Sequence, residues 1–216
     1  MSQIHYQALS ALLCYPEQEL LDALPEIRSA LSTQPALLQA VEPLLTHLSG
    51  GDLIALQEAY VATFDRNPAH SLHLFEHIHG EDRARGQAMV DLMEEYKTHG
   101  FEMSSEELPD YVPLFLEFLS QCEPDVASPL LGDAVHVLHH VAGKLADNAS
   151  PYASVLQAVV SQSPVAPEPL VTPPVRDMDE AMETFGPGVD GIEPLLKPAS
   201  PATAPLNFYR QMPQTA

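Results

Sequence analysis

Over residues 1–160, apolar side chains recur at intervals of three or four, and this spacing leaves little room for any structure but helices. Leu56, Tyr60 and Phe64, for example, fall on one face of a helix. Runs that alternate apolar with polar residues are scarce, and no Asn-Gly or Asp-Gly turn joins two of them. The pattern predicts an all-α protein, a single bundle of about seven to nine helices.

Capping and helix-breaking residues divide this region into segments. Asp52 is placed to cap the N-terminus of one helix, and Gly100 stands where a helix over 83–99 would end. A proline removes a backbone donor and crowds the preceding turn. We therefore expect Pro25 to bend or break the helix that contains it, and Pro43 to break another.

The chain changes character near residue 160. Eleven of its 21 prolines lie within the segment 161–216, a density that disfavours helices and central strands. We predict a helical domain over 1–160 and a disordered, acidic, proline-rich tail over 161–216. Two short apolar patches in this tail, 178–185 and 206–209, are candidates for docking, although an untethered tail fits the composition better.

The charge balance restricts the partners. Thirty acidic residues against nine basic ones give a formal net charge of −21. Such a surface repels nucleic acid and anionic lipid headgroups and attracts a basic partner. No run approaches the roughly 20 apolar residues that span a bilayer, and the N-terminus lacks the basic start of a signal peptide. Cys14 and Cys122 form no disulfide framework. These features predict a cytoplasmic protein without membrane insertion.

Motifs for catalysis are missing from the sequence. It contains no GxSxG elbow, no glycine-rich phosphate loop and no HExxH zinc motif. Histidines do crowd together at His70, His73, His77 and His79, so a helical metalloprotein stays open as an alternative. The ordinary interpretation is that these are loop and surface residues. We expect no enzyme activity and no metal site.

Aromatic side chains at helical spacing suggest a groove for a peptide, although such residues are more often core. The candidates for its lining are Tyr60, Phe64, Tyr111, Phe115 and Phe118. Acidic neighbours would meet the basic residues of the peptide; these are Glu58, Asp65, Glu107, Asp110 and Glu117.

Two stretches, 60–101 and 107–120, closely resemble the nitrate reductase molybdenum cofactor assembly chaperones, the delta subunits of the respiratory enzyme. The wider family comprises all-helical maturation chaperones of molybdenum-dependent redox enzymes. Its Glu-x-Pro-Asp signature, followed by a hydrophobic residue, matches Glu107 to Tyr111. A second signature consists of an aromatic residue, two intervening residues and then Leu-Phe. It matches at Tyr60 and Phe64, with Thr63 in place of the usual leucine.

The resemblance implies a function. Such a chaperone binds the basic N-terminal segment of the apo catalytic (alpha) subunit in the cytoplasm and delays its attachment to the membrane. It promotes insertion of the molybdenum guanine dinucleotide cofactor and then leaves, so it holds no cofactor permanently. Proteins of cofactor biosynthesis are further candidate partners. A chaperone for another molybdenum oxidoreductase and a subunit retained in the mature complex remain alternatives, although the stretch 77–89 resembles the nitrate reductase branch.

The groove and the resemblance together give a predicted client-binding set. Its members are Tyr60, Phe64, Asp65, Arg66, His77, His79, Glu107, Pro109, Asp110, Tyr111, Phe115, Glu117 and Phe118. We hypothesise in addition that the histidines over 70–79 tune the affinity for the client with pH.

The Glu-x-Pro-Asp signature also has a local structural interpretation. Asp110 would cap a helix over 111–122, and Pro109 would stand in or near its first turn. Replacing Asp110 with alanine would then cost about 1 kcal/mol of stability. Glu107 would reach the same helix end or pair with Arg83 or Arg85.

Overall fold

The computed structural model describes residues 3–79, 83–103 and 107–170. Within these ranges the chain forms nine α-helices and one 3-10 helix, and the only β-type pairing is an isolated bridge. The predicted all-α class is confirmed. The predicted tail lies, from residue 171 onward, outside the described residues. The elements are α1 (Ile4–Leu13), α2 (Gln18–Leu31), α3 (Pro35–Gly50), α4 (Leu53–Phe64), η1 (Pro68–His70), α5 (Glu76–His79), α6 (Arg83–Thr98), α7 (Val112–Gln121), α8 (Pro124–Asp147) and α9 (Ala153–Ser161).

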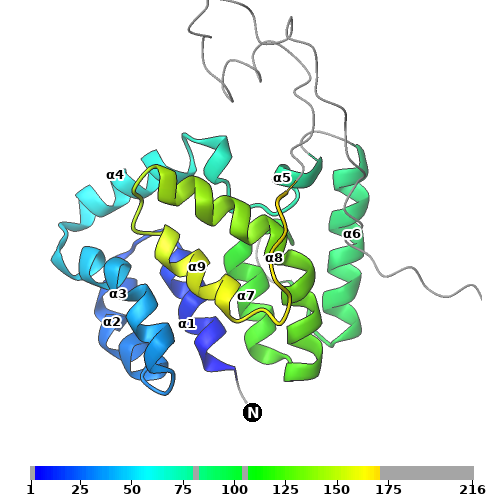
Figure 1. Ribbon diagram of the computed structural model, residues 1–216, viewed down its shortest axis with the longest axis horizontal. Coiled ribbons are helices and arrows are strands. Elements are labelled where there is room, and N and C mark those ends of the chain that lie inside the picture. Colours follow the sequence, from blue (N-terminus) through cyan, green and yellow to red (C-terminus); the bar gives the residue numbers. More distant parts are fainter. Residues whose placement is uncertain (1–2, 80–82, 104–106, 171–216) are drawn as a thin grey trace, which may run out of the picture. The chain divides into compact units, whose positions relative to one another are not determined.

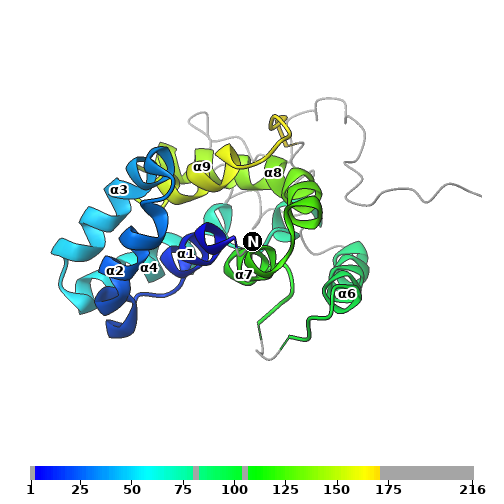
Figure 2. The ribbon, with the colours of Figure 1, turned by 90° about the horizontal axis from the view of Figure 1, so that it is seen from below.

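Helices α1, α3, α7, α8 and α9 enclose the core. Helix α1 packs against α7, and α9 packs against both α3 and α8 (Figure 1). Leucines fill the interfaces, and several of them, such as Leu12, Leu45, Leu116 and Leu138, have no exposed surface. Each contributes about 1.5–3 kcal/mol through burial. Figure 2 shows α6 at the edge of this arrangement, beyond α7. None of the helices in the described ranges is long and apolar enough to cross a bilayer.

The predicted breaks at Pro25 and Pro43 are wrong, because α2 and α3 run through them. A proline inside a helix costs about 3 kcal/mol. Buried side chains beside each proline offset that cost: Leu24 and Ile27 flank Pro25, and Leu44 follows Pro43. Tertiary packing therefore overrides the local preference at both positions.

The caps predicted at Asp52 and Gly100 are confirmed. The Asp52 carboxylate accepts the Ala55 N–H at 3.4 Å at the start of α4. Gly100 follows the end of α6 with φ of +85°, a left-handed conformation that glycine adopts without strain.

The chain beyond α9 turns back along α8 (Figure 1, orange-yellow). Val165 lies against Gly132, where an added Cβ would come within 2.9 Å of the Val165 methyl group. The Glu168 N–H donates to Nδ1 of His136 at 2.9 Å. The predicted boundary at residue 160 is therefore close to the end of α9, but residues 162–170 still lie along the helical domain.

Candidate functional site

The two stretches that carry the resemblance meet in space. The Val112 N–H donates to the Leu72 carbonyl at 2.8 Å, and the Leu74 N–H donates to the Asp110 carbonyl at 3.1 Å. An isolated antiparallel bridge joins His73 to Tyr111 between these two bonds. The segment 71–75 and the start of α7 are thereby paired, although they lie far apart along the chain.

The Asp110 side chain links the two segments of this junction, and the prediction that it caps α7 is wrong. Its side chain has no exposed surface. Its carboxylate accepts the Phe75 N–H at 3.0 Å and faces Nδ1 of His73 at 3.3 Å. The N-cap of α7 is Tyr111, which makes no side-chain capping bond. Because the carboxylate is bound to the 73–75 segment, it connects two distant parts of the chain.

Pro109 and Glu107 also differ from the local prediction. The proline in the first turn of α7 is Pro113, and Pro109 instead accepts a hydrogen bond from the Tyr96 hydroxyl through its carbonyl, at 2.7 Å. Arg85, predicted as a partner of Glu107, pairs with Glu76 at 2.9 Å. The side chain of Arg83 is outside the described structure. Glu107 is exposed.

We call Tyr15, Leu108 and Tyr111 the tyrosine patch. Tyr15 and Tyr111 both lie against the buried Tyr60, and the Tyr111 N–H donates to the Leu108 carbonyl at 3.1 Å. The Tyr60 hydroxyl donates to the Leu13 carbonyl at 2.9 Å and lies 3.5 Å from the Tyr111 hydroxyl. The Tyr15 ring meets the Tyr60 ring edge-on, with centroids 5.5 Å apart. Tyr15 is 42% exposed and Leu108 is 40% exposed. One tyrosine ring and one leucine side chain are thus open to solvent in this patch.

Three exposed acids, Asp65, Glu107 and Glu117, lie close enough to Tyr111 or Cys14 to act on them electrostatically, and we call them the acidic rim. Burial raises the pKa of Tyr111 to about 12, and the negative charges of Glu107 and Asp65 act in the same direction. Burial raises the pKa of Cys14 to about 11, again helped by Glu117 and Glu107. The three carboxylates therefore act on the same small region of the surface, which would attract a cation.

The predicted aromatic groove divides into two clusters under this surface. Tyr60, Phe64, Phe115 and Phe118 are all buried. The Phe64 ring meets the Tyr60 ring at a tilt and the Tyr152 ring edge-on, whereas Phe118 contacts the rings of Tyr96 and Phe101. Of the five predicted lining residues, only Tyr111 is partly exposed. Sequence reasoning missed Tyr15 and Leu108.

The remaining predicted positions lie around the same junction. Arg66 is exposed after the end of α4. The His77 ring donates from Nε2 to the Ser71 carbonyl at 2.8 Å and lies 5.9 Å from the ring of His140. Burial lowers the pKa of both histidines. His79 lies near Phe75, with ring centroids 5.9 Å apart. In the described part of the chain, no three His, Cys, Asp or Glu side chains are placed to hold a metal ion.

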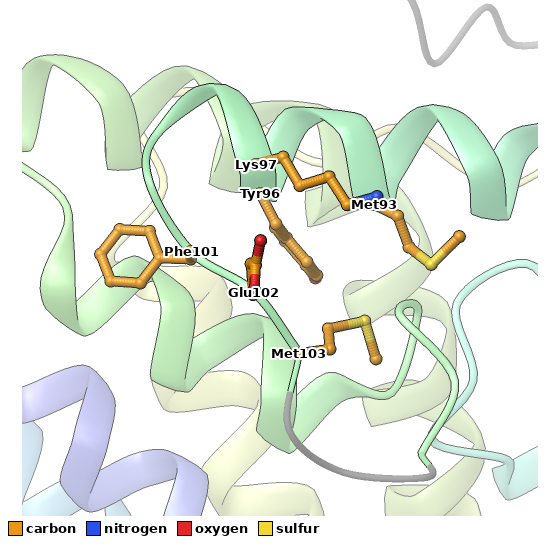
Figure 3. A pocket seen from close by; sticks show the side chains of 6 residues that line it. All are labelled: Met93, Tyr96, Lys97, Phe101, Glu102 and Met103. Atoms are coloured by element: carbon orange, nitrogen blue, oxygen red, sulfur yellow. The ribbon is translucent and has the colours of Figure 1, made fainter.

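A separate pocket of about 360 Å³ opens between α6 and the segment that follows it. Figure 3 shows Met93, Tyr96 and Lys97 from α6 above the opening, with Phe101, Glu102 and Met103 around and below it. Methionines adapt to differently shaped ligands. The hydroxyl of Tyr96 connects the wall of this pocket to Pro109 and hence to the junction.

The bond between His73 and Asp110 predicts a pH-dependent contribution to stability. Hydrogen bonding to Asp110 raises the pKa of His73, with a further contribution from Glu76, while burial and Arg85 oppose it. Protonated His73 is favoured in the fold, so its stabilisation is fully present below its unfolded pKa of about 6.5 and is lost as the pH rises through the higher folded value.

We expect His73→Gln to reduce the free energy of unfolding more at pH 6 than at pH 8.5, as measured by urea titration. His139→Gln, at an exposed position on α8, serves as the control and should cost the same at both pH values. An equal loss for His73→Gln at both pH values would contradict the ion pair.

Comparison with known proteins identifies the family. The family described as nitrate reductase delta subunit matches residues 30–158, which is more than half of the chain. This chain belongs to that family. The relationship inferred from the sequence is thereby confirmed.

Two relatives show how far the similarity extends. The nitrate reductase molybdenum cofactor assembly chaperone NarJ of Escherichia coli K12 is 40% identical over 149 residues, which cover 67% of this chain and 63% of that protein. A probable nitrate reductase molybdenum cofactor assembly chaperone of Bacillus subtilis is 33% identical over 162 residues, covering 74% of this chain and 88% of that protein. This chain thus spans less than two thirds of the length of the first relative.

The fold is similar to that of a solved structure. The crystal structure of a proposed redox enzyme maturation protein from Archaeoglobus fulgidus matches with a TM-score of 0.56 and 22% identity, over 73% of this chain and 90% of that one. This match shows that the helical architecture is shared.

Proposed function

We propose that this chain is an assembly chaperone that binds the basic N-terminal segment of the apo catalytic subunit of a nitrate reductase through the tyrosine patch and its acidic rim. The observation that carries the proposal is the exposed Tyr15 and Leu108 beside Asp65 and Glu107, at the junction of the two family signatures. The names of the relatives, which are assembly chaperones and not catalysts, support the same role. The chain itself is not an enzyme.

The chemistry of the patch suits a basic, amphipathic segment. Tyrosine rings offer apolar contact area together with a hydroxyl for hydrogen bonding. Carboxylates at the rim attract lysine or arginine and exclude acidic segments. The net charge of −21 adds long-range attraction, which raises the rate of encounter. The apolar centre of the patch therefore supplies the affinity, and the acidic rim supplies the selectivity.

Binding of this kind would act before the client is complete. A segment held on the patch is withheld from the membrane, so attachment is delayed in the cytoplasm while the molybdenum guanine dinucleotide cofactor is inserted. The cofactor belongs to the client, and proteins of its biosynthesis are candidate further partners. Folding of the client after insertion would withdraw the segment and release the chaperone.

A cellular experiment tests this role. The catalytic subunit purified from cells that lack this chain is expected to contain much less molybdenum than subunit from complete cells. The wild-type chain should restore the metal, and the variant Asp65→Lys/Glu107→Lys should not. A catalytic subunit with its full molybdenum content in the absence of this chain would refute the assembly role.

Pull-down separates recognition from insertion. The chain should retain the apo catalytic subunit, and deletion of the N-terminal segment of that subunit should abolish retention. Equal retention with and without the segment would place recognition elsewhere on the client.

A further inference from the structure

A sharp turn at the end of α6 builds the pocket of about 360 Å³. The Gly100 N–H donates to the Lys97 carbonyl at 2.9 Å, and the Phe101 N–H donates to the Tyr96 carbonyl at 3.0 Å. This pair of bonds is the turn that ends helices at a left-handed glycine. The chain reverses there, so residues 101–103 line the pocket below α6 (Figure 3). We call the space lined by Met93, Tyr96, Lys97, Phe101, Glu102 and Met103 the methionine pocket.

The two aromatic walls of the methionine pocket are held in place from behind. The Tyr96 hydroxyl donates to the Pro109 carbonyl at 2.7 Å, and the Tyr96 ring lies 4.5 Å from the Phe118 ring, measured between centroids. The Phe101 ring meets the same Phe118 ring edge-on, at 5.4 Å. Because both rings pack on one side chain of α7, these walls are already in position before a ligand arrives.

The remaining walls decide what the pocket can hold. Met93 and Met103 are half-buried, and their unbranched thioether chains adapt to apolar groups of different shape. Lys97 and Glu102 are exposed and carry opposite charges, so the lining favours neither sign of charge in a ligand. A volume near the lower end of the range for ligand pockets, roughly 300–1,000 Å³, suits a large aliphatic or aromatic side chain.

The methionine pocket adjoins the tyrosine patch and its acidic rim. Pro109, which holds the Tyr96 hydroxyl, directly follows Leu108 of the patch. Phe118, which carries both aromatic walls, directly follows Glu117 of the rim. From Tyr111 to Phe118 the chain advances by about 10 Å along the helix axis, whereas ten residues of a helical ligand span about 15 Å. A short segment lying along α7 is therefore long enough to contact both places.

We propose that the methionine pocket is a second contact for the client segment and takes one of its large apolar side chains, while the acidic rim takes its basic residues. The inference rests on the proposed function, because it assigns the pocket and the patch to one ligand. An amphipathic segment has an apolar face to cover, and Tyr15 and Leu108 offer it little area. Val90, which is 42% exposed one turn before Met93 on α6, extends the apolar surface beyond the pocket.

Methionine methyl groups report on the pocket in the unaltered protein. In the full-length chain labelled with [methyl-13C]methionine, the NMR signals of Met93 and Met103 are expected to shift when a peptide from the N-terminus of the catalytic subunit is added. Met89, one turn earlier on α6 and outside the pocket lining, serves as the control and should shift far less. A peptide that binds without moving the signals of Met93 and Met103, or that moves Met89 equally, would overturn the inference.

Peptide affinity at two salt concentrations separates the pocket from the rim. Met93→Ala/Met103→Ala in the full-length chain is expected to weaken peptide binding about tenfold, because apolar contacts are lost, whereas Met89→Ala should bind like wild type. The loss should be the same at low and high salt, unlike that of Asp65→Lys/Glu107→Lys.

The possible failures of this experiment are distinguishable. Unchanged affinity in Met93→Ala/Met103→Ala, or a loss that disappears at high salt, would overturn the pocket as a contact and leave the proposed function intact. A peptide that binds neither wild type nor any variant would overturn the proposed function, and the inference with it.

Discussion

Replacing Asp110 with alanine is expected to lower the free energy of unfolding by about 3 kcal/mol, three times the cost of losing a helix cap. The carboxylate is fully buried, accepts the Phe75 N–H at 3.0 Å and pairs with His73. Alanine removes both interactions at once and leaves no group to replace them. Urea denaturation with an unchanged slope measures the loss.

Two comparisons make this prediction specific. Asp110→Asn keeps an oxygen for the Phe75 N–H and should lose less stability than Asp110→Ala. Asp65→Ala, at an exposed position, should change the free energy of unfolding by less than about 0.5 kcal/mol. A loss of only about 1 kcal/mol for Asp110→Ala would indicate instead that Asp110 acts as a helix cap. Unchanged stability together with abolished client binding would show that Asp110 contacts the client directly.

Reversing two charges of the acidic rim is expected to weaken binding of the client peptide by about tenfold or more, mainly by slowing association. The variant is Asp65→Lys/Glu107→Lys, in which both positions are exposed, so the fold should tolerate the change. Titration of the variant beside wild type at low salt measures the effect. The difference between them should shrink as salt screens the rim.

The control for this variant carries the same change of net charge. Glu26→Lys/Asp147→Lys alters two exposed acids on α2 and α8. If attraction were a property of total charge alone, both double variants would weaken binding equally. We expect the rim variant to lose far more, and equal losses would remove the acidic rim from the account.

Local rules in the sequence predicted most of the helices. Helix α4 begins after Asp52 and α6 ends before Gly100, as capping chemistry requires, because these determinants act within a few residues. Pro25 and Pro43 misled the prediction, since the packing that tolerates them involves helices elsewhere in the chain. Helix propensity describes isolated segments, whereas α2 and α3 are stabilised by packing against the core.

The candidate site could be predicted only in part. The resemblance pointed to one region of the structure, because the two signatures meet there, and Asp65, Glu107 and Tyr111 lie on its surface. Tyr15 was missed because it follows the end of α1 and belongs to no helical stripe. Asp110 was assigned to the nearest helix, while its true partner, the Phe75 amide, is 35 residues away. Pairing over such distances has no local pattern in the sequence.

Calorimetric titration shows directly whether the chain binds the N-terminal segment of its client. The full-length chain is titrated with a peptide from the N-terminus of the catalytic subunit, at low and high salt, and with a scrambled peptide of equal charge. We expect binding at micromolar concentration or tighter for the true peptide only, weakening with salt. No binding, or equal binding of the scrambled peptide, would contradict it.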